Sequence, residues 1–450
     1  MASGGAPLTA AEVAPLFDAS FAAHAHVALA VSGGSDSTAL MYLAAEWRAA
    51  RGKTGPSISV VTVDHGLRPG SAGEAVLVAD LAHGLGLPHA TLAWTGPKPE
   101  TGVQAAAREA RYRLIGAHLA ANGWPAVATA HTEDDQAETL LLRLARGSGV
   151  DGLAAMRSVI QHDAMLVLRP LLPIPKRRLI ATLLARGLSW SEDPSNQRLE
   201  FERVRLRAAR AALEGVGLTP RPLAQSARRL ARASDALDAT TGAVVDAAGK
   251  ELSISPLGFA EVGWPWLLRQ PAEIRLRILS GLIAAVGGQG GPVSLGQLEA
   301  LTEGGGWAPP IGRTLAGAMA AASDRDTVVL MREAGRDGLP ALVLAPARDA
   351  IWDNRFKVRY AASREQPLTI RALGAAGVRE VAAALPQAAA HAVGAVPRRA
   401  LEALPGFWLG ARLLAAPALG LECVDSGCAG ASAMFIGAPF LGRRMPFRAV

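Results

Sequence analysis

The stretch HVALAVSGGSDSTALMYLAAEWRAAR, residues 26–51, decides the fold of this chain. It begins with the short β-rich run HVALAV, and over residues 37–51 its apolar residues recur at spacings of three and four, as in an amphipathic helix. The turn SGGSDS lies between the two and opens the helix. Its glycines allow a tight turn that presents backbone N–H groups to an anion, and the helix N-terminus adds partial positive charge. We therefore predict that a nucleotide phosphate binds at Ser32, Gly33, Gly34, Ser35, Asp36 and Ser37.

SGGSDS lacks the GK[ST] ending of a Walker A loop, so it places no lysine at the phosphates. It resembles instead the PP-loop, whose families release pyrophosphate and transfer AMP. The alternative is an ordinary Gly/Ser turn in which Asp36 only starts a helix. In the PP-loop interpretation Asp36 lies where the α-phosphate meets a metal ion, and Mg²⁺ prefers carboxylate and phosphate oxygens. We therefore predict that Asp36 is a catalytic, Mg²⁺-linked residue.

Short β-rich runs alternate with amphipathic helical runs from about residue 25 to residue 190. After HVALAV the strand candidates are ISVVTVDH, HATLAW and AVATAH, and the helix candidates span residues 37–51, 72–84, 102–122 and 133–146. This alternation predicts an α/β fold, a doubly wound parallel sheet with helices on both faces.

The length of 450 residues favours about three domains. We predict a catalytic domain over residues 1–215, a mostly helical substrate-binding domain over 216–340, and a small C-terminal α+β domain over 341–450. TLAGAMAAAS and DTVVLMRE predict a hairpin at the end of the middle domain. Residues 278–298 reach membrane-spanning length, but glycines and a proline interrupt them, so we expect two helices and a turn, and no membrane partner.

The net charge of +7 favours a polyanionic partner such as nucleic acid, although many arginine-rich proteins bind no anion. The N-terminus lacks the pattern of a secretory signal, so we expect a cytoplasmic protein. The chain has only two cysteines, Cys423 and Cys428, which suits a reducing compartment and no disulfide framework. The oligomeric state is open, and a homodimer is one option.

An acidic cluster opens the helix that follows AVATAH, in AHTEDDQAETLLLRLARGSG. Asp134 and Glu138 are four residues apart and Asp135 and Glu138 are three apart, so both pairs share a helical face near the sheet edge that carries Asp36. Clustered carboxylates repel one another unless a cation is bound, and that cation is either Mg²⁺ or the ammonium of an amine substrate. The alternative is a solvated acidic first turn that the helix dipole favours.

Basic residues recur at three places near the same edge, each with an alternative interpretation. Asp64, His65 and Arg68 in VDHGLRP either contact a phosphate or form a loop pair. The helix QAAAREARYRL carries Arg108, Arg111 and Tyr112 on one face, for RNA or for salt bridges. Finally, the run Arg203, Arg205 and Arg207 is either an RNA contact or a solvated basic helix.

Six elements in order resemble the tRNA(Ile)-lysidine synthase family: SGGSDS, VDHGLRP, QAAAREARYRL, AHTEDDQAETLLLRLARGSGVDGLAAM, RPLLPIPKRRL, and DPSN followed by RVRLR. The resemblance implies a ligase that uses ATP and Mg²⁺ on an isoleucine tRNA with a CAU anticodon. O2 of the wobble cytidine attacks the α-phosphate, pyrophosphate leaves, and the side-chain amine of L-lysine then displaces AMP at C2 to give lysidine.

The same resemblance implies roles for individual residues. Asp135 and Glu138 would bind lysine, residues 32–37 would bind ATP, and residues 341–450 would bind tRNA. Many relatives have two histidines where this chain has His131 and Thr132, which leaves the role of the second imidazole in doubt.

Three rival functions remain. A tRNA thiolase needs reactive cysteines or an iron–sulfur cluster, but residues 1–215 contain no cysteine, and Cys423 with Cys428 makes a poor metal site. An RNA-binding protein with an inert nucleotide site is disfavoured by the intact set of Asp36, Asp135 and Glu138. An amide-forming ligase usually needs an ammonia source, and no glutaminase-like Cys/His arrangement is present.

Overall fold

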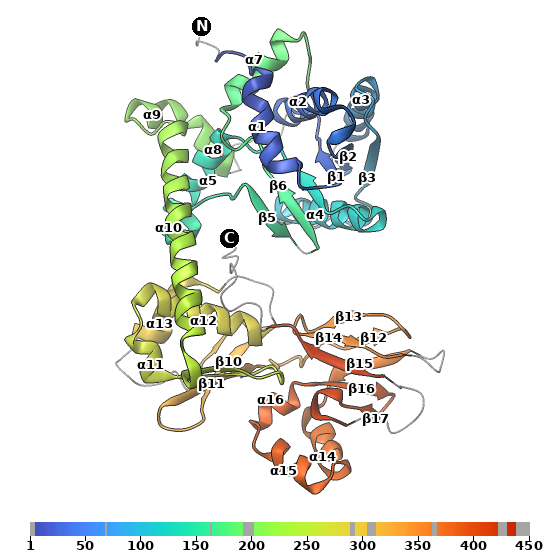
Figure 1. Cartoon of the computed structure of the whole chain (residues 1–450), viewed down its shortest axis with the longest axis vertical. Helices are drawn as coiled ribbons and strands as arrows, with labels where there is room; N and C mark the ends of the chain where they lie inside the picture. Colours follow the sequence, from blue (N-terminus) through green and yellow to red (C-terminus); the bar gives the residue numbers. More distant parts are fainter. Residues whose placement is uncertain are drawn as a thin grey trace. The chain divides into compact units, whose positions relative to one another are not determined.

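The computed structural model describes residues 5–67, 70–162, 164–191, 202–288, 293–303, 312–361, 367–421 and 430–437. Arg68, the DPSN motif at residues 193–196, and both cysteines lie outside the described residues. The chain forms two compact units, Met1–Ala231 and Arg232–Val450, both drawn in Figure 1. The division into three domains at residues 215 and 340 stays a prediction.

A six-stranded sheet organises the first unit, in the order β3-β2-β1-β4-β6-β5. Its strands are β1 His26–Ala30, β2 Ser57–Asp64, β3 His89–Ala93, β4 Ala126–Ala128, β5 Val159–His162 and β6 Met165–Leu168. All pairs are parallel except the edge pair β5 and β6. The chain winds from β1 through β2 to β3 and then returns to place β4 on the other side of β1. The strand order therefore reverses between β1 and β4, and ligands bind beside such a switch point at the carboxyl ends of the strands.

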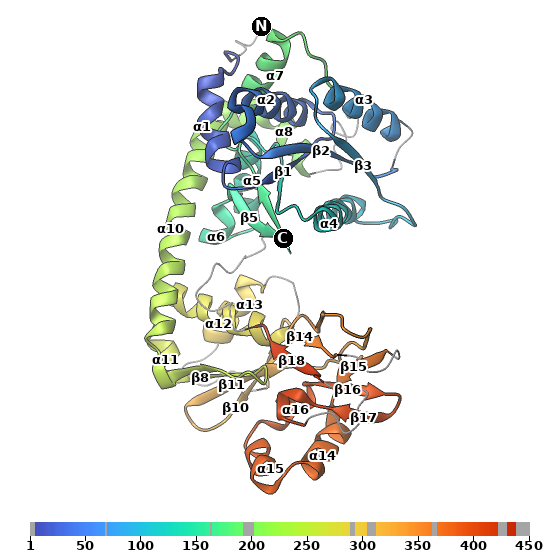
Figure 2. The ribbon, with the colours of Figure 1, turned by 45° about the vertical axis from the view of Figure 1, so that its right-hand side comes forward.

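Helices cover both faces of this sheet (Figure 2). On one face lie α1 Ala10–Phe21, α2 Ser35–Arg51, α3 Ser71–Gly84 and α7 Lys176–Ala185, whose apolar side chains form one core with those of β1 and β2. The other face is covered by α4 Val103–Asn122, which packs on alternate residues of the same strands. The division follows from the period of two in a strand: Val27 and Leu29 point to the first core, and Ala28 to the second.

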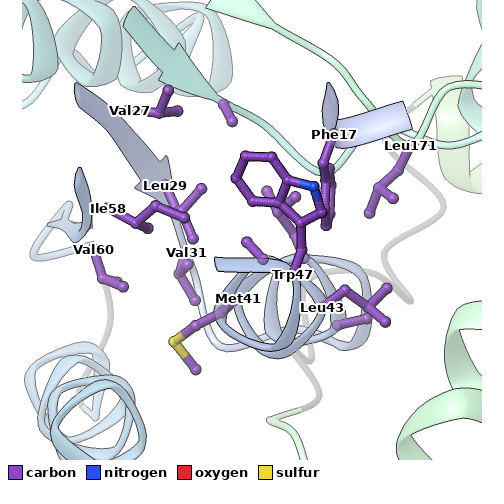
Figure 3. Close-up of a cluster of buried hydrophobic side chains, with 14 of the residues drawn as sticks. Phe17, Val27, Leu29, Val31, Met41, Leu43, Trp47, Ile58, Val60 and Leu171 are labelled. Atoms are coloured by element: carbon purple, nitrogen blue, oxygen red, sulfur yellow. The ribbon is translucent and has the colours of Figure 1, made fainter. Parts of the chain in front are cut away.

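Trp47 of α2 lies in the first core (Figure 3). Its ring meets that of Phe17 edge-on, with centroids 5.9 Å apart, and its Nε1 donates to Asp18 Oδ1 at 2.8 Å. The aromatic ring is thus buried while its polar atom keeps a partner. This packing fixes α2, and with it the turn that precedes the helix.

The predicted doubly wound, mostly parallel sheet is confirmed, as are the four predicted strands and four predicted helices to within a few residues at their ends. The antiparallel edge pair β5 and β6 was not predicted from the sequence. The remaining helices of this unit are α5 Glu133–Ala145, α6 Val150–Leu153, α8 Glu202–Ala208 and α9 Arg210–Gly215, and α10 Pro220–Asp246 runs across the unit boundary.

The second unit combines helices with three antiparallel sheets. Its first part has α11 Trp264–Arg269, α12 Ala272–Gly287, α13 Leu295–Glu303 and a sheet in the order β7-β8-β11-β10-β9. The strands of that sheet are β7 Leu252–Ile254, β8 Ala260–Gly263, β9 Thr314–Leu315, β10 Ala318–Ala322 and β11 Thr327–Arg332. The predicted hairpin is confirmed as β10 and β11, and the predicted pair of helices as α12 and α13.

The last part of the chain contains two further sheets. One has the order β12-β15-β16-β17, made of Leu342–Leu344, Leu368–Ala372, Pro405–Leu409 and Arg412–Ala415. The other is β13-β14-β18, made of Ala350–Trp352, Phe356–Arg359 and Ser432–Phe435. Three helices accompany them: α14 Gly374–Ala384, α15 Gln387–Gly394 and α16 Arg398–Glu402. This arrangement confirms the predicted α+β character of the C-terminal region.

A buried charge cluster joins the two parts of the second unit. Asp353, whose side chain is 3% exposed, accepts hydrogen bonds from Arg332 of β11 and from Arg355, at 2.7–2.9 Å. Arg355 is 1% exposed and also donates to the carbonyl oxygen of Ala403 at 2.8 Å. Two buried guanidinium groups therefore depend on one carboxylate.

None of the helices in the described segments is long and apolar enough to cross a membrane.

Candidate active site

The turn between β1 and α2 is braced from within. Gly33 has a φ of +86°, a conformation that favours glycine, while Gly34 has a φ of −72° and a ψ of 163° at the N-cap of α2. Ser37 Oγ accepts from the Ser32 N–H at 3.1 Å and donates to the Gly34 carbonyl at 3.1 Å. Thr38 Oγ1 donates to the Gly33 carbonyl at 3.2 Å. The serine and threonine hydroxyls thus hold the turn in shape without a ligand.

Asp36, the second residue of α2, forms an ion pair with Lys176, the first residue of α7. The distance from Lys176 Nζ to Asp36 Oδ2 is 2.8 Å, and the aspartate side chain is 23% exposed. Burial raises the pKa of Asp36, whereas the ammonium beside it lowers that pKa and the charge of Asp135 raises it further. The predicted metal-linked carboxylate therefore already has a cationic partner that the sequence analysis did not identify.

The acidic first turn of α5 is used partly for capping. Asp135 Oδ2 accepts from the Thr132 N–H and from Thr132 Oγ1, each at 2.8 Å, in a capping box. Asp134 Oδ2 accepts from the Lys176 N–H at 2.8 Å, and its Oδ1 accepts from Arg210 at 3.0 Å. The alternative of a solvated acidic turn is therefore wrong: the side chains of Asp135 and Asp134 are only 16% and 12% exposed, Asp135 caps α5, and Asp134 joins α5 to α7 and α9.

Arg207 of α8 contacts both carboxylate oxygens of Glu138 and lies near Oδ1 of Asp135. Its Nε donates to Glu138 Oε1 at 2.6 Å and its Nη2 to Glu138 Oε2 at 3.1 Å, a bidentate pair. Nη2 is also 4.0 Å from Asp135 Oδ1. The hydrogen bond with Glu138 is the largest cause of the raised pKa of Arg207, and the charges of Asp135 and Asp36 act in the same direction.

The acidic residues at the switch-point edge thus meet two cations: Asp36 pairs with Lys176, and Glu138 pairs with Arg207. Glu138, predicted to bind a cation, and Arg207, predicted to contact RNA, are in direct contact, and Asp135 lies 4.0 Å from the same guanidinium. The guanidinium is 41% exposed, whereas the side chains of Asp135 and Glu138 are 16% and 13% exposed. A site of this kind can bind a cationic group at its carboxylates and an anionic group at the neighbouring turn.

Residues 8–211 match the sequence model of the PP-loop domain. The chain is 47% identical over 324 residues to the tRNA(Ile)-lysidine synthase of Bradyrhizobium sp. strain BTAi1, an alignment that covers 69% of this chain and 86% of the relative. It is 38% identical over 400 residues to the tRNA(Ile)-lysidine synthase of Ruegeria pomeroyi, covering 87% of this chain and 88% of the relative. The chain belongs to the tRNA(Ile)-lysidine synthase family. The predicted family is therefore confirmed, and with it the predicted enzyme class, a tRNA-modifying ligase with a PP-loop ATP-binding domain.

Lys176 of the motif RPLLPIPKRRL reaches the site, although no role was predicted for it from the sequence. Lys176 pairs with Asp36, and Arg169 is 3% exposed, with its Nη1 donating to the Arg157 carbonyl at 2.8 Å. The sequence showed only that Lys176 is a basic residue in a motif resembling the family. No periodicity or spacing indicated that Asp36 would be its partner.

The surroundings of His131 favour its neutral form. Burial is the main cause that lowers its pKa to about 3, and the charge of Arg169 adds to the effect. Its Nδ1 lies 2.9 Å from Thr129 Oγ1. Thr132 caps α5: its hydroxyl accepts from the Asp135 N–H at 3.4 Å, which gives this side chain a structural role at the start of the helix.

The other predicted basic residues are dispersed. The guanidinium of Arg108 lies 5.2 Å from the ring centroid of Tyr112, and Arg111 Nη2 lies 3.4 Å from His65 Nε2. Arg203 and Arg205 are exposed on α8. Asp64 Oδ1 accepts from the Gly66 N–H at 2.9 Å and from Ser71 Oγ at 2.7 Å, which favours the loop interpretation of that aspartate. RNA contacts by these arginines stay a prediction.

Proposed function

We propose that this chain converts the wobble cytidine of an isoleucine tRNA with a CAU anticodon to lysidine, with ATP and L-lysine as co-substrates. Family membership over most of the chain supports the overall reaction. The observation that carries the mechanism is that cations lie against the predicted carboxylates: Lys176 on Asp36 at the PP-loop turn, and Arg207 on Glu138, 4.0 Å from Asp135. A reaction between ATP and an amine needs an anion site and a cation site next to each other.

In the first step, O2 of the cytidine attacks the α-phosphate of ATP. The O2–phosphorus bond forms as the bond to pyrophosphate breaks, which leaves an adenylated base. Residues 32–37 would bind the phosphates through backbone N–H groups and the α2 N-terminus. Asp36 would hold Mg²⁺ together with phosphate oxygens, an arrangement that fits because Mg²⁺ is usually bound by one or two carboxylates plus substrate phosphates. The ion would neutralise charge on the departing pyrophosphate.

In the second step, the side-chain amine of lysine attacks C2 of the adenylated base after the ammonium has given one proton to solvent. The C2–N bond forms, the bond from C2 to the adenylate oxygen breaks, AMP leaves, and the nitrogen releases its extra proton to solvent. Glu138 and Asp135 would bind lysine by its positive charge. A side-chain cation, the guanidinium of Arg207, already sits on this pair, which supports the assignment.

The tRNA would be held by basic side chains around the same edge and by the C-terminal region. We assign RNA contacts to Arg108, Arg111, Arg203, Arg205 and Arg207, and tRNA binding also to residues 341–450. Phosphate contacts of this kind position an RNA without reading its sequence. Because tRNA and ATP are cytoplasmic substrates, we place the enzyme in the cytoplasm.

The reaction can be tested in two stages with the full chain. Exchange of labelled pyrophosphate into ATP, with an unmodified CAU transcript and Mg²⁺, reports adenylation. Incorporation of labelled lysine, followed by digestion to nucleosides, reports ligation. Asp36→Ala should abolish both, whereas Asp80→Ala, which removes an exposed carboxylate on α3, should keep both.

A transcript with guanosine in place of the wobble cytidine serves as the substrate control and should give neither product. Absence of pyrophosphate exchange by the unaltered chain with the CAU transcript would favour an RNA-binding protein with an inert nucleotide site.

A further inference from the structure

The PP-loop turn has no positively charged side chain to balance the negative charge of the ATP phosphates. It contains no lysine or arginine, and backbone N–H groups supply only partial charges. Asp36 adds a negative charge at the same place. Even with Mg²⁺ bound, a triphosphate beside Asp36 would keep a net negative charge, which a cationic side chain from another element of the fold can balance.

Lys176 is the cation that the fold brings to this turn. It is separated from Asp36 by 140 residues in the sequence, yet its Nζ lies 2.8 Å from Asp36 Oδ2. Its side chain is 41% exposed, so a ligand can reach the ammonium group. Lysine binds phosphate as a compact point charge on a flexible stem, and it can therefore turn from one partner to another.

The backbone of Lys176 is held in place by its neighbours, while its side chain is 41% exposed. Its N–H donates to Asp134 Oδ2 at 2.8 Å, and the Glu133 N–H donates to the Ile174 carbonyl at 3.0 Å. Farther along α7, Leu179 and Leu183 are buried in the core shared with α2. The start of α7 is therefore rigidly joined to both α5 and α2, on either side of the switch point.

Stability does not explain the pair of Lys176 and Asp36. A half-exposed ammonium gains little from a neighbouring carboxylate, because water screens the attraction. Asp36 is also the carboxylate proposed to hold Mg²⁺ together with the phosphates, so the ammonium that contacts Asp36 would lie beside the same phosphates.

We propose that Lys176 is the phosphate-binding lysine of this enzyme, which contacts the β- and γ-phosphate oxygens of ATP and stabilises the departing pyrophosphate. It supplies from α7 the charge that a Walker A loop carries within the loop itself. The proposal rests on the proposed function, since it assigns a residue to the adenylation step.

Binding of two nucleotides separates this role from a structural one. The probes are α,β-methylene-ATP, which cannot release pyrophosphate, and AMP, which lacks the β- and γ-phosphates. Loss of one charge-assisted contact should weaken binding of the methylene analogue to Lys176→Met about 10- to 100-fold. AMP should bind to the variant as it does to the unaltered chain, and Lys176→Arg should recover part of the loss for the analogue.

Arg177→Ala is the matched control, because it removes the adjacent exposed cation on the same helix and should change neither affinity. If Lys176→Met binds AMP and the analogue with equally reduced affinity, the lysine only supports the site. If both affinities are unchanged, the lysine is dispensable. Either result overturns the proposal. If the unaltered chain binds the analogue but exchanges no pyrophosphate, the proposed function fails while the comparison still tests Lys176. If it binds no ATP analogue at all, both fail.

Discussion

Replacement of Glu138 by glutamine separates the two half-reactions. The amide has the size of the carboxylate but no charge, so a cation loses its ionic partner while packing is kept. In the structure Glu138 is 13% exposed and holds Arg207 through two hydrogen bonds of 2.6 and 3.1 Å. Because that guanidinium is 41% exposed, its pairing contributes only about 0.5–1 kcal/mol to stability after solvent screening.

The expected effect on lysine is larger than the effect on folding. A charge-assisted hydrogen bond to the lysine ammonium is worth about 1.5–3 kcal/mol, which corresponds to about a 10- to 100-fold rise in the lysine concentration needed for half-maximal ligation. Pyrophosphate exchange, which needs no lysine, should change little. The melting temperature should fall by only about 2–4 °C.

The assay compares exchange and ligation in the same preparation, with lysine varied in the ligation reaction. Glu214→Gln is the matched control, because Glu214 also accepts a hydrogen bond from an arginine Nε, that of Arg210 at 2.7 Å, but lies outside the proposed lysine site. It should leave both half-reactions intact. Equal loss of exchange and ligation in Glu138→Gln, or an unchanged dependence on lysine, would refute the assignment of Glu138 to lysine.

Three further predictions concern the turn, the second unit and a buried imidazole. Gly33→Ala should lower the free energy of unfolding by about 1–2 kcal/mol, since its φ is +86°. Gly34→Ala should lower it less, because Gly34 has a φ of −72° and the nearest atom lies 3.9 Å from the added Cβ. The reverse order of the two variants in denaturant titrations would contradict the strain argument. Asp353→Asn should cost about 3–5 kcal/mol in unfolding of the second unit, because two buried guanidinium groups lose their carboxylate. The control Asp349→Asn, at a side chain that is 43% exposed, should have little effect, and similar losses for the two variants would argue against burial as the cause. Burial, with a smaller contribution from the charge of Arg111, lowers the pKa of His65 from 6.5 to about 4, so NMR should find its ring neutral between about pH 8 and pH 5. Because the unfolded chain binds that proton more readily, the stability that His65 contributes should be lost as the pH falls from 6.5 toward 4, and a midpoint near 6.5 in the folded protein would be inconsistent with a buried imidazole.

The local elements of the first unit could be predicted because their signals are local. The period of two in HVALAV and the three- and four-residue spacing after SGGSDS predict β1 and α2 directly. The four-residue stretch VIQH, by contrast, is too short for a periodic signal, and β5 forms because β6 offers it an antiparallel partner. Local pattern thus indicated β1 to β4 but not the antiparallel pair β5 and β6.

The candidate site divides in the same way between local pattern and tertiary contact. By itself the sequence determined the glycine turn, the helix that follows it, and the spacing that puts Asp135 and Glu138 on one face of α5. Only the tertiary structure decided which cations meet these carboxylates: Lys176 lies 140 residues from Asp36 in the chain, and Arg207 lies 69 residues from Glu138. The physical reason is that backbone periodicity relates residues within a few turns of one another, whereas strand order and helix packing determine which distant segments share an edge of the sheet.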